Sequence, residues 1–147
     1  MPKINWLRLI IGGVVAAVIC FFSDGFLHEK ILATDWTSVY DNLGAKEPHP
    51  HGMGLAYFAV FELGRGLLSI FIYVLMRGHW KAGPKTAAIA GVVAWLAFSI
   101  AGPTQFIPLG FFSNALWMKA AAFQFISSIV AAIAGAALYK EPATKNA

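Results

Sequence analysis

Residues 86–118, TAAIAGVVAWLAFSIAGPTQFIPLGFFSNALWM, form a run of 33 residues without a single Asp, Glu, Lys or Arg. A helix that crosses the hydrocarbon core of a bilayer needs only ~20 mainly apolar residues, so this run is too long for one span. A Gly-Pro pair at 102–103 and a Pro-Leu-Gly sequence at 108–110 interrupt it. Because proline lacks an amide donor and disfavours helix in the residue before it, these breaks predict two spans, at residues 85–101 and 113–139.

Two further apolar runs precede this stretch, at residues 4–26 and 52–76. The first contains Arg8 near its start, and the second is interrupted only by Glu62 and Arg65. The sequence therefore predicts an all-α polytopic membrane protein. Its four transmembrane helices would form two hairpins within a single membrane domain that spans the 147 residues.

The composition agrees with a membrane protein and excludes two other classes. Apolar residues make up 59 % of the chain and charged residues 12 %, whereas ordinary globular chains carry about 25 % charged residues. The mean hydropathy is +0.67. So few charges would not cover a soluble particle, and a disordered chain has the opposite composition. The single cysteine excludes an internal disulfide.

The distribution of Lys and Arg predicts the orientation in the membrane. Seven of these residues fall on one side of the predicted spans: Lys3, Arg8, Arg77, Lys81, Lys85, Lys140 and Lys145. The connection over residues 27–51 holds only Lys30 and Lys46, together with four acidic residues. Because positive loops stay inside, we expect both termini in the cytoplasm and residues 27–51 outside. The net charge of +4 then reflects topology and anionic lipid, and no nucleic-acid partner is predicted.

The outer connection contains a short amphipathic pattern over residues 31–43. Leu32, Trp36, Val39 and Leu43 are spaced four, three and four apart, which places them on one helical face. One interpretation is a separate helix that lies at the outer membrane interface. The alternative is that the first helix continues beyond the membrane.

Several polar residues fall inside the predicted spans, where an ionisable group is a functional candidate. Asp24 and His28 share a face of the first helix, and Glu62 and Arg65 share a face of the second. Glu62 is expected to pair with Arg65 on its own helix or with Lys119 across the bundle. The predicted intramembrane polar network comprises Asp24, His28, Glu62, Arg65, Lys119 and Gln124. It would be either a structural pair that fixes helix register or a proton or anion site.

Histidines and carboxylates near the outer end of the first helix raise the question of a metal. His28, His49 and His51 are the nearest candidates, but their spacing matches no recognised ligand motif. No metal site is therefore predicted, and the sequence leaves any cofactor unknown. The sequence also shows no arrangement of a nucleophile, a general base and a group that orients the base, so we expect no enzymatic activity.

Three short stretches resemble a known group of proteins. They are Asn5-Trp6 through Gly12-Gly13, Gly83-Pro84-Lys85-Thr86-Ala87 leading into Gly91 and Trp95, and Ala136-Ala137-Leu138-Tyr139-Lys140-Glu141. Together they resemble uncharacterised small bacterial inner-membrane proteins with four helices. The resemblance implies a multi-pass protein of the bacterial cell inner membrane, and it implies no activity.

Small residues recur on single helix faces, as Gly13, Ala17 and Cys20 do on the first helix. Because small residues let helices approach closely, they predict contacts between helices. The leading hypothesis is a non-enzymatic accessory subunit or homo-oligomer that binds lipids, other membrane subunits or itself through such faces. The alternative is a small proton- or ion-coupled transporter that uses Glu62, Arg65, Lys119 and Asp24. A metal-dependent enzyme using His28 comes third.

Overall fold

The computed structural model describes residues 4–44 and 52–140, in which it has helices and turns but no strand. Four helices are long and apolar enough to cross a membrane: Trp6–Ile31, Met53–Met76, Pro84–Thr104 and Asn114–Ala137. The predicted all-α fold with four spans is confirmed. The chain is an integral membrane protein.

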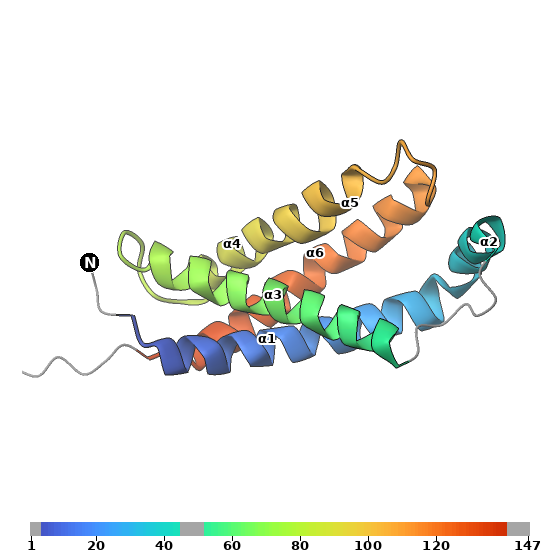
Figure 1. The fold of residues 1–147 in the computed structure, drawn as a ribbon. Coiled ribbons are helices and arrows are strands. Elements are labelled where there is room, and N and C mark those ends of the chain that lie inside the picture. Colours follow the sequence, from blue (N-terminus) through green and yellow to red (C-terminus); the bar gives the residue numbers. More distant parts are fainter. Residues whose placement is uncertain (1–3, 45–51, 141–147) are drawn as a thin grey trace, which may run out of the picture.

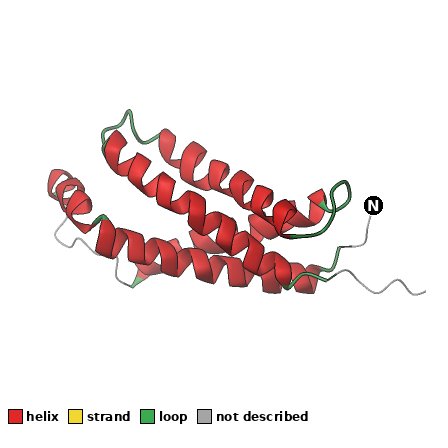
Figure 2. Ribbon diagram, turned by 180° about the vertical axis from the view of Figure 1, so that it is seen from behind, coloured by secondary structure: helices red, strands yellow, loops and turns green. Residues whose placement is uncertain are grey.

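The spans follow one another around a four-helix bundle. Its elements are α1 (Trp6–Phe26), η1 (Leu27–Ile31), α2 (Ala33–Leu43), α3 (Met53–Met76), α4 (Pro84–Trp95), η2 (Leu96–Ala101), α5 (Gly102–Thr104) and α6 (Asn114–Ala137). α1 packs on α3, α3 on α4, α4 on α6, and α6 on α1 (Figure 1). Seen from behind, the same four helices run along the length of the molecule (Figure 2). We call the end that carries α2 and the α5–α6 turn the α2 end.

Glycines bring the backbones of neighbouring helices into contact. A Cβ on Gly12 would lie 2.5 Å from the carbonyl oxygen of Gly135, and one on Gly91 would lie 2.6 Å from that of Ser128. Neither position has room for a side chain without movement of a helix. The predicted small-residue face of α1 also lies between helices of the same chain, because Gly13 packs against Leu67 and Ala17 against Gly66 of α3.

The first connection contains the predicted separate helix. α1 ends in the π-helical turn η1, and the chain bends at Leu32, with φ −106° and ψ 12°, before α2 begins. Gly44, with φ +65°, ends α2. In Figure 1, α2 is viewed nearly along its axis while α1 lies across the page, so the two helices cross steeply. The alternative of one continuous helix is wrong beyond Ile31.

The apolar face of α2 packs on the bundle. Leu32 and Val39 are buried in a cluster with Leu27 and Leu116. Leu43, the fourth residue of the predicted face, is 54 % exposed. α2 is thus held against α1 and α6 by protein contacts.

The third span continues past the predicted break at Gly102 and Pro103. The π-helical η2 leads into α5, and the helix ends only at Thr104. Proline has no N–H for the carbonyl four residues earlier, which is that of Ser99. The indole Nε1 of Trp117 donates to this carbonyl at 3.0 Å. A side chain from α6 therefore replaces the missing helical hydrogen bond, and the prediction that the span ends at residue 101 is wrong.

Candidate functional site

Arg65 lies at the centre of a polar network between α1, α3 and α6, with only 1 % of its surface exposed. Its Nη1 donates to Asp24 Oδ2 at 2.9 Å and to Glu62 Oε2 at 3.2 Å. Its Nη2 donates to Ser128 Oγ at 2.5 Å and to the backbone oxygen of Gln124 at 3.3 Å. One guanidinium group therefore connects three of the four spans.

Asp24 keeps one carboxylate oxygen without a donor. Its Oδ2 also accepts from Gln124 Nε2, at 2.6 Å. Its Oδ1 has no hydrogen-bond partner in the described part of the chain. This oxygen is buried, and only 10 % of the Asp24 side chain is exposed. A buried acceptor without a partner costs about 1–3 kcal/mol. Asp24 is thus a site at which an outside donor would be favourable.

The charges of the network do not balance when every group is ionised. Asp24 and Glu62 bring two negative charges, and Arg65 brings one positive charge to both of them. In a low-dielectric interior an uncompensated charge is expensive. A proton or a bound cation would balance the extra carboxylate.

The structure separates the predicted partners of Glu62. The expected i, i+3 pair with Arg65 is present. Lys119 does not join the network, because its Nζ binds Asp35 Oδ2 at 2.9 Å and its side chain is 55 % exposed. The bend at Leu32 folds α2 over the end of the bundle and places Asp35 beside α6. The prediction that Lys119 reaches Glu62 is therefore wrong.

His28 serves α2 and not the charged network. Its Nδ1 accepts a hydrogen bond from Trp36 Nε1 at 2.7 Å, and the two rings meet edge to face. An accepting Nδ1 belongs to a neutral imidazole whose proton is on Nε2. Within residues 4–44 and 52–140, no group of three His, Cys, Asp or Glu residues could hold a metal. His49 and His51 lie outside these ranges.

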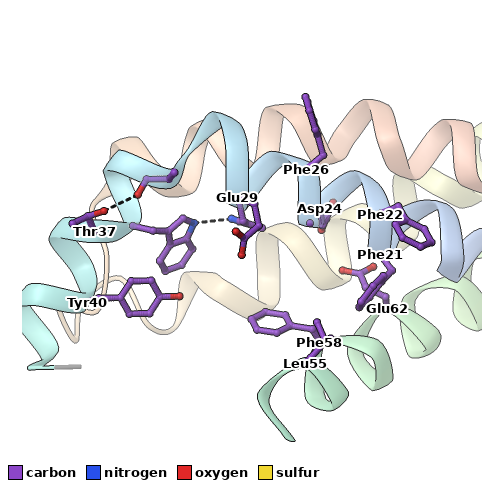
Figure 3. A pocket seen from close by; sticks show the side chains of 14 residues that line it. Phe21, Phe22, Asp24, Phe26, Glu29, Thr37, Tyr40, Leu55, Phe58 and Glu62 are labelled. Atoms are coloured by element: carbon purple, nitrogen blue, oxygen red, sulfur yellow. Dashed lines mark hydrogen bonds between the residues drawn. The ribbon is translucent and has the colours of Figure 1, made fainter. Parts of the chain in front are cut away.

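A cavity of about 420 Å³ leads to the network from the α2 end, between α1, α2 and α3. Small-molecule sites typically have volumes of roughly 300–1,000 Å³. In Figure 3, Phe58 and Glu62 of α3 lie on one side of this cavity, and Glu29 and Tyr40 lie on the other. Asp24 also lines it. Both carboxylates that bind Arg65 are therefore cavity residues.

The cavity has an apolar rim that faces outward. Phe22 is 69 % exposed, Phe26 is 56 % exposed and Phe58 is 51 % exposed. These residues belong to spans, where the surroundings of the bundle are lipid. The opening of the cavity is therefore bordered by apolar side chains on the spans.

The arrangement combines an apolar pocket, a carboxylate pair and one guanidinium that holds both acids in place. Ser127 and Ser128, whose hydroxyls lie 3.5 Å and 2.5 Å from Arg65 Nη2, were not predicted as part of the network, because a serine in an apolar span carries no charge that would single it out. The cavity itself had no sequence signal, since three separate elements form it. Comparisons with protein-family models, curated proteins and solved structures gave no match for this chain.

Proposed function

We propose that this protein binds a small amphiphilic molecule in the cavity between α1, α2 and α3. The observation that carries this proposal is that an apolar cavity of about 420 Å³ ends on two carboxylates that share one guanidinium. Apolar walls with a few convergent polar groups are typical of small-molecule sites. The Asp24–Glu62–Arg65 network would form the polar end of the site and the aromatic side chains its apolar part.

The packing gives less support to an accessory subunit that binds partners through small-residue faces. Gly12, Gly91 and Gly135 are occupied by contacts within the chain. The exposed residues of the spans are large, as with Leu7 and Val60, each 68 % exposed. Such side chains suit lipid tails. The packing therefore favours a ligand bound inside the bundle over a protein partner bound to the outer faces of the helices.

Ion-coupled transport is a second candidate, favoured by the extra carboxylate. When Asp24 and Glu62 face one guanidinium, a proton and a cationic ligand would compete for the remaining charge. Through such competition, binding of the ligand releases a proton, and in a transporter this links movement of the ligand to movement of a proton. It requires in addition that the bundle opens toward its other end.

We propose that the protein lies in a bacterial inner membrane with its α2 end outside, as expected from the distribution of Lys and Arg, so that the cavity opens in the outer half of the bilayer. We expect a cytoplasm-only reporter to be active when fused to the C-terminus and inactive when inserted within residues 45–51. The opposite pattern would invert the proposed orientation. Activity at both positions would put the two sites on the same side, which contradicts the three spans that separate them, Met53–Met76, Pro84–Thr104 and Asn114–Ala137.

Photolabelling of the purified protein in a neutral maltoside detergent tests ligand binding. The probe is an alkyl alcohol with a diazirine in its chain, which inserts into nearby side chains on illumination. We expect its adducts to concentrate on cavity residues, over positions 21–36 of α1 to α2 and 55–62 of α3, relative to exposed residues of α6. An even distribution over all lipid-facing positions would contradict the proposed function.

A further inference from the structure

Acidic side chains line the cavity. Asp24, Glu29 and Glu62 are among the residues that line it, and none of the described lining residues is Lys or Arg. Arg65 contacts Asp24 and Glu62 without being a lining residue itself. A ligand in the cavity therefore meets carboxylates first, while the guanidinium holds them in place.

Asp24 supplies an independent sign of a missing donor. Its Oδ1 is buried without a hydrogen-bond partner in the described chain, although Oδ2 receives two donors, from Arg65 and Gln124. An ammonium group has three donors and no acceptor. Such a head would donate to the carboxylates of Asp24 and Glu62, both of which line the cavity.

The remaining walls suit an apolar body attached to that head. Aromatic rings line the cavity from all three elements, among them Phe21 of α1, Trp36 of α2 and Phe58 of α3. Ring faces attract cations as well as alkyl chains. A bare inorganic cation fits less well, because the described residues contain no group of three His, Cys, Asp or Glu side chains that could hold a metal ion.

We propose that the ligand is a cationic amphiphile: an ammonium head that binds Asp24 and Glu62, on an apolar body that lies along the aromatic wall. This inference rests on the proposed function, since it names the ligand class of the same cavity. The ammonium could belong to a free amine or to the headgroup of an amino lipid. Both present the same donors to the same acceptors.

The test compares three diazirine probes with the same alkyl chain and different heads: a primary amine, an alcohol and a carboxylate. In neutral detergent we expect the amine to label cavity positions about tenfold more than the alcohol, after normalisation to exposed α6 positions, and the carboxylate to label them least. Glu62→Gln should remove the preference for the amine. The charges of Asp24 and Arg65 then neutralise each other, and the network no longer has an extra carboxylate for the ammonium group. Asp41→Asn, an exposed acid of α2 outside the cavity, is the matched control and should change nothing.

Labelling by the alcohol separates the two proposals. If the alcohol labels the cavity and the amine shows no preference, or the preference survives Glu62→Gln, the cationic head is wrong and the cavity site stands. If no probe concentrates in the cavity, the proposed function itself fails. Unlabelled competitors then identify the source: competition by phosphatidylethanolamine indicates a lipid headgroup, and competition by dodecylamine alone indicates a free amine.

Discussion

Arg65→Gln is expected to cause the largest loss of stability of any single substitution in the chain. It leaves Asp24 and Glu62 facing each other without the cation that both bind, and it removes the donors to Ser128 and Gln124. Removing one partner of a buried charge pair costs roughly 3–5 kcal/mol. The melting temperature of the purified protein in detergent measures the effect, and failure to assemble at all is the extreme form of the same result.

Matched variants show whether charge is the cause. Glu62→Gln alone should cost little, because an amide oxygen still accepts from Arg65 and the Asp24–Arg65 pair at 2.9 Å remains. Adding Glu62→Gln to Arg65→Gln should restore only part of the stability, since Asp24 stays without its cation. Adding Asp24→Asn as well should restore more. Equal stability of Arg65→Gln and the wild type, or no recovery in the triple variant, would show that the network is not a coupled unit.

Gly66→Ala is expected to be the most damaging of the small changes. A Cβ at this position would collide with the backbone of α1, at Gly13 and Ala17. Because backbone atoms cannot rotate away, α1 and α3 would have to separate. Overpacking of this kind typically costs about 1–3 kcal/mol. The separation would also disturb the contact between Asp24 and Arg65, because Arg65 is the neighbour of Gly66 in the chain.

Gly64→Ala is the matched control on the same helix. Its Cβ would meet only the ring of Phe98, at 3.6 Å, which is an ordinary contact. Since alanine favours helix over glycine by up to ~1 kcal/mol, this variant should be neutral or slightly stabilised. Thermal unfolding in detergent distinguishes the two. Equal melting temperatures for Gly66→Ala and Gly64→Ala would contradict the described packing of α1 on α3.

The spans could be predicted from the sequence because length and hydropathy decide them. α3 and α6 begin and end within two residues of the predicted bounds. The end of the third span could not be predicted, because it depends on the Trp117 indole that replaces the hydrogen bond lost at Pro103. Tertiary contacts of this kind have no local signal.

The charged residues of the site could be predicted from the sequence, but the pairs that they form could not. A charge inside an apolar span is visible in the sequence, which is how Asp24, Glu62 and Arg65 were identified. That Asp24 binds Arg65, 41 positions later, depends on how α1 is rotated against α3. Lys119 could not be placed because its partner Asp35 is brought to α6 by the fold of α2, which has no signal in the sequence of α6. The cavity likewise depends on the bend at Leu32.

The central claim is that the cavity between α1, α2 and α3 is a binding site whose polar end is the Asp24–Glu62–Arg65 network. The substitution that blocks it is Gly25→Phe, because Gly25 lines the cavity and a Cβ there meets no atom within 4 Å. We therefore expect the new ring to fill part of the cavity without displacing a helix. Val18→Phe, seven residues earlier on the same face of α1, adds the same ring at an exposed position outside the cavity.

The direct test is photolabelling of these two variants with the alkyl alcohol probe. Gly25→Phe should lose the adducts on residues 55–62 while it keeps the wild-type melting temperature and the adducts on exposed α6 positions. Val18→Phe should be labelled as the wild type is. Undiminished cavity labelling in a folded Gly25→Phe variant, or equal loss in both variants, would contradict the claim.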